Sequence, residues 1–376
     1  MIAVIGEGWA ALGTVGFLVT SGKPVHWITG TGARMHPPLP SLPFGEDSSA
    51  VIWTELARRL EVEISPEQVG SYLREFRNKA FREPAWVKAP SLEARQEVIR
   101  ECLWEPEQTL VGAYETRYAV TLNEIEEAIR SKLTPENYPN LRRTDDVPVT
   151  GIRTTGGAVT SLALASGEEI EVEQVIFADR WSAISQVAGL PKGMTFIRKR
   201  GELGVLQATF SHETPIGQDL QEGFFNTLQK ESGEQRDRHL WGYFDSTGKR
   251  SFWTICLSAE EVEDNHEIAK RLRRLKSSLD KMFTGSDWLP EGKTEFMQNV
   301  CEEQVRLEES VLFSQGNPVR EAVTIDGYSG LSFMTDGYGP MYAMMQVGGF
   351  ALSMSLGMEQ PKSETENVDL VGAQVL

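Results

Sequence analysis

The sequence predicts an α/β protein in which a doubly wound, Rossmann-like domain carries an inserted α+β domain built on an antiparallel sheet. Three observations predict this fold. The first 30 residues read as strand, helix and strand, which is the unit of a parallel doubly wound sheet. Residues 149–177 read as a β-meander with a buried strand after it, and residues 331–356 as strand, turn and helix. Because both ends of the chain have the same character, we expect them to meet in one domain.

The N-terminal unit is defined by apolar runs between glycines. Ile2–Ile5 is a short apolar run that ends at Gly6, as a buried strand does. Residues 9–21 place apolar groups around a helix, which Gly22 terminates. A second short strand follows at Val25–Ile28. The pattern therefore predicts two neighbouring parallel strands joined by a helix.

The rest of the chain divides into segments of different character. A proline-rich loop covers 36–43, and helical spacing predicts helices over 49–64, 66–79, 123–133 and 259–283. Residues 203–211, 239–245 and 251–257 read as half-exposed antiparallel strands. We expect the doubly wound domain to comprise 1–50, 123–190 and 326–358, the inserted domain 51–122 and 191–325, and a polar tail 359–376.

Composition excludes several functional classes. The chain has 37 basic and 54 acidic residues among 376, a net charge of −17, which disfavours nucleic acid and anionic membrane surfaces as partners. There is no apolar run long enough to span a membrane, and the N-terminus lacks the basic region of a signal peptide. The three cysteines are scattered and the histidines lack metal-ligand spacing, so we expect a cytoplasmic protein without a metal site.

The first motif with chemical meaning is Gly6-Glu7-Gly8-Trp9-Ala10-Ala11, between the first strand and its helix. Gly6 allows a tight turn, Gly8 lets a pyrophosphate approach the helix N-terminus, and the small Ala11 lets helix and strand pack closely. This context predicts a dinucleotide site. The alternative is a glycine-rich turn that binds no ligand.

The end of the second strand departs from the usual pattern. An acidic residue is expected there to hold a ribose hydroxyl, and the chain has Thr29 instead. A threonine makes a single uncharged hydrogen bond, so this change lowers the expected affinity. Arg34 lies close by in sequence and is either a phosphate ligand or an ordinary surface residue.

Three segments together resemble the flavoprotein oxidoreductases of the amine oxidase, protoporphyrinogen oxidase and phytoene desaturase group. They are residues 2–29, the meander with Gly157, Gly167 and the strand 175–178, and the segment 331–340 with the helix after it. Each segment is moderately specific, and their order and spacing make the resemblance stronger. It implies an FAD-binding domain at the two ends of the chain and a substrate domain in the insertion.

The resemblance also implies roles for single residues. Gly6, Gly8 and Ala11 would line the FAD pyrophosphate, Thr29 stands where the family keeps Glu for the ribose, and the Val149 backbone would contact the adenine. Asp336 would hold the ribityl or pyrophosphate part, or else only cap the next helix. The amides of 337–341, which include those of Gly337, Gly339 and Met341, would face the flavin, where a helix N-terminus stabilises negative charge. Arg34 lies in Gly32-Ala33-Arg34, which partly resembles the family's glycine–arginine stretch.

Four aromatic residues are candidates for the substrate pocket. Tyr338 and Tyr342 adjoin the expected flavin edge, and Trp241 and Tyr243 lie on expected strands of the substrate domain. Packing in the core is the alternative for each of them.

We therefore expect an FAD-dependent oxidoreductase that binds FAD non-covalently, since no cysteine adjoins the third segment. It would pass a hydride from a C–N or C–C bond of a small organic substrate to flavin N5. No catalytic residue stands out in the sequence. The alternatives are a non-catalytic relative with weakened or lost FAD binding, which Thr29 and Thr335 motivate, and an NAD(P)-dependent dehydrogenase.

Overall fold

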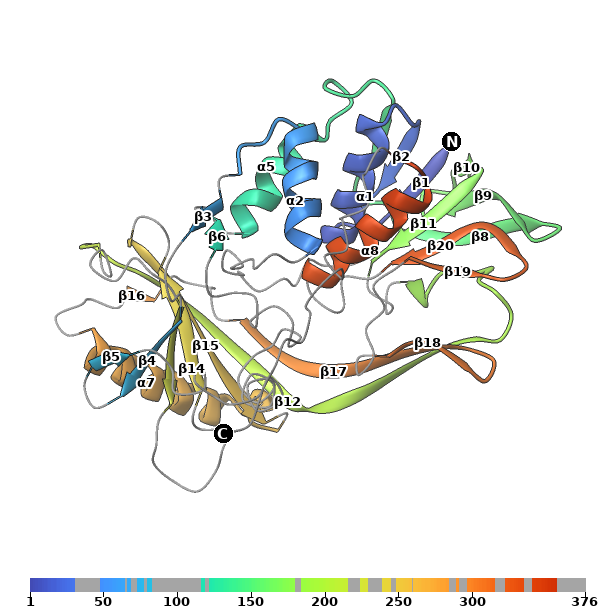
Figure 1. The fold of residues 1–376 in the computed structure, drawn as a ribbon. Helices are drawn as coiled ribbons and strands as arrows, with labels where there is room; N and C mark the ends of the chain where they lie inside the picture. Colours follow the sequence, from blue (N-terminus) through green and yellow to red (C-terminus); the bar gives the residue numbers. More distant parts are fainter. Residues whose placement is uncertain are drawn as a thin grey trace, which may run out of the picture.

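The computed structural model describes residues 1–30, 48–64, 66–68, 73–77, 80–82, 116–118, 122–179, 184–215, 224–228, 239–244, 248–258, 260–283, 289–290, 296–314, 322–334 and 340–356. Figure 1 shows two large sheets, with a layer of helices over the first and the long helix of residues 265–282 on the second. Within this part of the chain, no helix is both long and apolar enough to cross a membrane.

The first sheet has a parallel centre made from distant parts of the chain. Its strand order is β10-β9-β20-β11-β1-β2-β7, with β8 and β19 attached at the side. The central strands are β20 (Tyr328–Met334), β11 (Gln174–Ala178), β1 (Ile2–Ile5), β2 (Val25–Ile28) and β7 (Leu141–Thr144), and each pairs in parallel with the next. Strands from the two ends of the chain, β1 and β2 with β20, therefore lie in one sheet.

Four helices cover one face of this sheet: α1 (Trp9–Thr20), α2 (Ser48–Arg59), α5 (Leu122–Lys132) and α8 (Pro340–Ser353). They pack closely because glycines stand at the crossing points. A Cβ on Gly13 would lie 3.0 Å from Val347, and one on Gly348 would lie 2.3 Å from Ile52. Residues 52–60 thus belong to the hydrophobic core between this helix layer and the first sheet, although the sequence assigned 51–122 to the inserted domain.

The opposite face carries the meander β8 (Val149–Thr155), β9 (Ala158–Leu164) and β10 (Glu169–Glu171), at the positions that the sequence predicts. Its apolar side chains form a second core with the sheet, in which the rings of Phe177 and Phe333 stack with centroids 5.5 Å apart. Its central strands β1, β2 and β11 are thus buried on both faces, which explains why they read as continuous apolar runs.

The second sheet is antiparallel except at one pairing. Its order is β18-β17-β12-β15-β14-β13-β4-β5, with β16 attached to β12. The bounds are β18 (Ser310–Ser314), β17 (Phe296–Leu307), β12 (Met194–Ser211), β15 (Arg250–Ser258), β14 (His239–Phe244), β13 (Phe224–Leu228), β4 (Leu73–Arg77), β5 (Ala80–Arg82) and β16 (Leu289–Pro290). The amphipathic helix α7 (Asn265–Met282), with the short helix η4 (Glu261–Glu263) before it, packs on this sheet through Ile268, Leu275 and Leu279.

The helix predicted over 66–79 is wrong. Residues of this segment form strands: β3 (Pro66–Gln68) pairs with β6 (Thr116–Tyr118), and β4 pairs with β13 and β5. Apolar spacing at Leu73 and Phe76 fits a helix in isolation, but an open sheet edge at β13 offers the backbone a ladder of hydrogen bonds, and this tertiary pairing overrides the local pattern.

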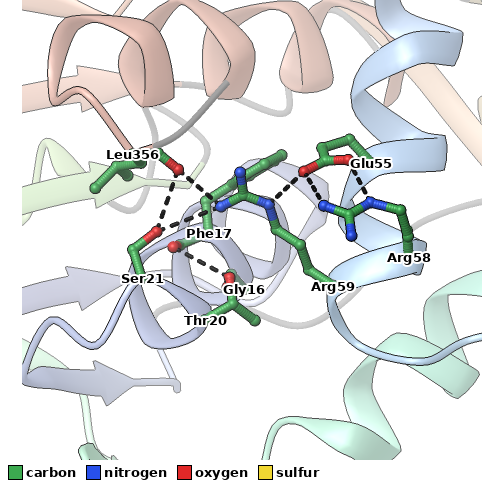
Figure 2. A network of polar contacts seen from close by, with 8 residues as sticks. All are labelled: Gly16, Phe17, Thr20, Ser21, Glu55, Arg58, Arg59 and Leu356. Atoms are coloured by element: carbon green, nitrogen blue, oxygen red, sulfur yellow. Dashed lines mark hydrogen bonds and ion pairs between the residues drawn. The ribbon is translucent and has the colours of Figure 1, made fainter. Parts of the chain in front are cut away.

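Ser21, Glu55, Arg59 and Leu356 form a polar clasp that connects helices of the helix layer (Figure 2). Arg59 Nη1 donates to the carbonyl oxygen of Leu356 at 2.8 Å and to Ser21 Oγ at 3.3 Å. Arg59 Nε donates to Glu55 Oε1 at 2.7 Å, and its guanidinium lies over the Phe17 ring. One side chain of α2 therefore links the ends of α1 and α8.

Candidate cofactor site

The site is built at the edge of the first sheet where its parallel strands end. The carboxyl ends of β20, β11, β1, β2 and β7 lie along this edge, which is where open α/β sheets bind ligands. The glycine loop follows β1, and α1 begins directly after it with Gly8 as an N-cap that makes no side-chain hydrogen bond. The helix N-terminus thus meets this edge through a residue without a side chain.

Gly6 shapes the loop. Its φ of +140° is one that other residues rarely adopt, and a Cβ there would lie 2.1 Å from the carbonyl oxygen of Ala178 on β11. Its own N–H donates to the carbonyl oxygen of Ile28 on β2 at 3.0 Å. The loop backbone is therefore held between β2 and β11, and no side chain projects from it at Gly6 or Gly8.

A tryptophan and an arginine hold the carbonyl groups of this loop. Trp27 Nε1 donates to the carbonyl oxygen of Gly6 at 2.8 Å. Arg130 on α5 donates from Nη2 to the carbonyl oxygen of Glu7, and to Glu126 Oε1 at 3.1 Å. The Arg130 guanidinium also lies over the Trp27 ring, 5.4 Å from its centroid. These contacts occupy the carbonyl oxygens of Gly6 and Glu7 with donors from β2 and α5.

The Glu7 side chain joins the loop to the end of β2. Its Oε1 accepts a hydrogen bond from the Gly30 N–H at 2.6 Å. Gly30 has a φ of +104°, and a Cβ on it would lie 2.6 Å from the backbone nitrogen of Val147. The backbone after β2 therefore crosses in close contact with the backbone after β7, at the base of the candidate site.

Thr29 lies at this crossing and is buried. Its hydroxyl donates to Asp145 Oδ1 at 3.0 Å and accepts from the Asp146 N–H at 3.3 Å. Its carbonyl oxygen accepts from the Val147 N–H at 3.2 Å, two residues before Val149 starts the meander. Gly6, Gly8 and Ala11 therefore lie in the loop and first turn of α1, Thr29 follows β2, and Val149 begins β8; that they bind a cofactor stays a prediction.

Two tryptophans lie beside the loop. Trp9 is the first residue of α1, and its ring meets Trp53 of α2 edge to face with centroids 5.0 Å apart. Both side chains are buried, and neither indole N–H has an acceptor in the described part of the chain. They provide an intrinsic fluorescent reporter at the helix N-terminus.

The remaining predicted residues lie partly or wholly outside the described residues. Arg34, Asp336, Gly337, Tyr338 and Gly339 are outside them. For Met341 and Tyr342 on α8, and for Trp241 and Tyr243 on β14, the structure describes the backbone and not the side chains. Their roles stay predictions. β20 ends at Met334 on the same edge of the sheet, and α8 begins at Pro340.

Sequence reasoning missed three residues of this site: Glu7, Arg130 and Asp145. Glu7 is the variable position of the glycine motif, where the motif specifies no chemistry. Arg130 follows Glu126 by four residues, a spacing typical of an ion pair on a helix, but that spacing does not show that the arginine reaches the loop. Asp145 follows a strand with a single buried residue, so no apolar run indicated that strand.

No family model matches the chain, and no curated protein matches it in sequence. Solved structures with the same fold do match. An oxidoreductase from Methanosarcina mazei has a TM-score of 0.59 at 13% identity, covering 93% of this chain and 99% of that one. The p-nitrophenol 4-monooxygenase PnpA from Pseudomonas putida DLL-E4 has a TM-score of 0.53 at 14% identity, covering 94% and 78%. Aklavinone-11 hydroxylase, solved with FAD and aklavinone, has a TM-score of 0.57 at 11% identity, covering 94% and 61%.

The chain therefore has the α/β fold of FAD-dependent monooxygenases and oxidoreductases, which bears out the flavoprotein fold at the level of its class. At this identity the likeness concerns the fold. It does not single out the amine oxidase, protoporphyrinogen oxidase and phytoene desaturase group.

Proposed function

We propose that this protein is an FAD-dependent oxidoreductase that acts on a small organic substrate. The observation that carries the proposal is the glycine loop: Gly6 has no room for a side chain against Ala178, and Gly8 opens α1 without a capping side chain. A loop that carries no side chain at these two positions, at a helix N-terminus, suits a pyrophosphate. Solved structures with this fold include one with FAD bound.

The residues present fit FAD. The loop from Gly6 to Ala11 would hold the pyrophosphate, the crossing at Thr29 would meet the ribose, and Val149 would meet the adenine. Arg34 and Asp336 are candidate ligands from outside the described residues. The backbone amides of 337–341 would face the flavin from the N-terminus of α8, as the sequence predicts.

The substrate would lie between the flavin and the second sheet, with the doubly wound domain binding the cofactor and the insertion binding the substrate. Tyr338, Tyr342, Trp241 and Tyr243 are the candidate pocket residues. When bound, the flavin supplies the redox chemistry. This chain's residues would orient the substrate, exclude water and stabilise charge at the flavin edge.

Two reaction types are open to this fold. The sequence resemblance favours hydride transfer from a C–N or C–C bond, which oxidises the substrate and reduces the flavin by two electrons. The names of PnpA and aklavinone-11 hydroxylase favour oxygen insertion, in which dioxygen, NAD(P)H and a proton convert the substrate to its hydroxylated form, with water and NAD(P)⁺ as the other products. The two differ in their demand for an external reductant.

The first test is the visible spectrum of the purified protein before and after heat denaturation and filtration. We expect bands near ~370 and ~450 nm, with FAD in the filtrate. A colourless protein that takes up no added FAD would overturn the proposal and favour a non-catalytic relative. Tryptophan fluorescence titrations with FAD, NADH and NADPH separate the flavin proposal from a nicotinamide-dependent dehydrogenase.

The second test separates the two reactions. Substrate turnover in ¹⁸O₂ without NAD(P)H, with formation of hydrogen peroxide and no label in the product, identifies a hydride-accepting oxidase. NAD(P)H-dependent incorporation of one ¹⁸O atom per product identifies a hydroxylase.

A further inference from the structure

A carboxylate stands beside the position where the acidic residue is missing. Thr29 follows β2 and Asp145 follows β7, and these two parallel strands end with Ile28 opposite Thr144. The next residues along each strand are therefore neighbours across the ladder. The Thr29 hydroxyl donates to Asp145 Oδ1 at 3.0 Å. The neighbouring strand β7 is followed by the negatively charged Asp145 at the same level of the sheet at which β2 is followed by the uncharged Thr29.

The geometry leaves one side of this carboxylate for a ligand. Both hydrogen bonds to the Asp145 side chain end on Oδ1, from Thr29 Oγ1 and from Arg143 Nε at 2.7 Å. Within the described ranges, Oδ2 accepts no hydrogen bond. The Asp145 side chain is 48% exposed. The carboxylate is therefore oriented through one oxygen and open at the other.

From this arrangement we infer that Asp145 accepts the hydroxyl hydrogen bonds of the adenosine ribose of FAD, with Thr29 as its positioning residue. The inference rests on the proposed function and deepens it. An ionised carboxylate accepts stronger hydrogen bonds from a diol than a threonine hydroxyl does. Asp145 lies one strand away from the usual position of the acid after β2, about 4.8 Å across the sheet. The Thr29 hydroxyl occupies the space between that position and Asp145.

The same contacts select against a 2′-phosphate. Sites for 2′-phosphorylated dinucleotides lack the acid and present an arginine instead. Arg143 is near enough to serve, but its Nε is bound to Asp145 and its guanidinium lies over the Trp27 ring, 4.7 Å from the centroid. The carboxylate itself would repel a phosphate. The site therefore prefers a free ribose diol.

The test uses flavin-free protein in three forms: wild type, Asp145→Asn and Asp146→Asn. Asp146 is the matched control because it is exposed, adjacent and equally charged, and its φ of +58° is tolerated by asparagine. FAD and FMN are titrated by fluorescence quenching. ADP, 2′-deoxy-ADP and adenosine 2′,5′-bisphosphate are then measured as competitors of FAD.

We expect wild type to bind FAD and to prefer ADP over 2′-deoxy-ADP. Asp145→Asn should weaken FAD about tenfold or more, the loss expected for hydrogen bonds to a charged group, and should leave FMN affinity unchanged because FMN lacks the adenosine. The preference for ADP should vanish in this variant, and the disadvantage of the 2′-phosphate should shrink. Asp146→Asn should behave as wild type.

A second variant tests the positioning residue. Thr29→Val removes the hydroxyl that orients Asp145 and keeps the size and branching of the side chain. It should reduce the preference for ADP over 2′-deoxy-ADP, a ratio that a general loss of stability does not change.

Equal weakening of FAD by Asp145→Asn and Asp146→Asn would overturn the inference, as would a deoxy discrimination that survives Asp145→Asn. Wild type that binds FAD with no preference between ADP and 2′-deoxy-ADP would overturn it while leaving the proposed function intact. Wild type that binds neither FAD nor ADP would instead overturn the proposed function, and the inference with it.

Discussion

The carbonyl oxygen of Ala178 lies 2.1 Å from the point where a Cβ on Gly6 would stand. Neither partner can yield easily, because Ala178 ends a central strand and Gly6 is bonded to β2. Gly6→Ala should therefore destabilise the fold by about 3 kcal/mol or more, combining the clash with an unfavourable φ. Urea unfolding followed by far-UV circular dichroism measures the change.

The matched control for this substitution is Gly22→Ala. Gly22 also has a positive φ, +73°, but a Cβ there meets nothing within 4 Å. Gly22→Ala should lower the free energy of unfolding only through its unfavourable backbone conformation, by about 1 kcal/mol. If the two variants are equally destabilised, the close approach of Gly6 to Ala178 contributes nothing and the account of the loop is wrong.

Removing the guanidinium of the polar clasp should loosen the helix layer. Arg59→Met keeps much of the apolar stem but loses the bonds to Leu356, Ser21 and Glu55 and the stacking of the guanidinium on Phe17. We expect a loss of about 1–2 kcal/mol in the free energy of unfolding. Hydrogen exchange should accelerate at the ends of α1 and α8 before it does in β1. Uniform acceleration across the sheet would contradict a local role.

The clasp should also respond to acid. Hydrogen bonds from Arg58, and then from Arg59, lower the pKa of Glu55 from 4.5 to about 2. A lowered pKa in the folded state means stabilisation that is complete above pH 4.5 and is lost as the pH falls towards 2. The free energy of unfolding should fall more steeply over this range in wild type than in Glu55→Gln. Parallel pH profiles would refute the assignment.

His26 gives a separate pH dependence near neutrality. Burial lowers its pKa below 6.5, and the charge on Arg142 lowers it further. The folded state therefore binds fewer protons than the unfolded state, so stability is retained above pH 6.5 and declines below it. His26→Gln should flatten the profile of unfolding free energy between pH 7 and 5. Other histidines affect both proteins alike, so the difference in slope is the relevant quantity.

The ion pair beside the glycine loop has a buried carboxylate and a half-buried guanidinium, so it should be costly to break. Arg130→Met removes the donor to the Glu7 carbonyl oxygen and leaves the carboxylate of Glu126, whose side chain is 8% exposed, without this partner. The expected loss is about 3 kcal/mol. The double variant Arg130→Met, Glu126→Gln should recover part of it, because the buried charge is gone. A double variant less stable than the single would show that Glu126 has a different role.

The sequence predicts the first sheet well and the second sheet in part. Strands β1, β2 and β11 are buried on both faces, so each reads as a continuous apolar run. The ends of these runs are clear, at Gly6 for β1 and at comparable turn residues for the others. The strands β4, β5 and β13 are short, and only their pairing in the folded chain distinguishes them from loop or helix. The helix expected over 66–79 is wrong for this reason.

The site divides in the same way. The motif from Gly6 to Ala11 is local, so its turn, its strand and its helix can be predicted together. The contact of Thr29 with Asp145 joins residues 116 positions apart, and the contact of Glu7 with Arg130 joins residues 123 apart. No local pattern encodes either, because each depends on which strand or helix becomes the neighbour in space.

The order of strands in the first sheet has a consequence for synthesis on the ribosome. β1 starts at residue 2, but its neighbour β11 ends at residue 178, and β20 beyond it ends at residue 334. The groove at Gly13 on α1 is likewise filled by Val347. The nascent N-terminal strand therefore waits, with its apolar residues uncovered, until most of the chain has emerged. We therefore expect this domain to complete its fold late in synthesis, after β20 and α8 have been made.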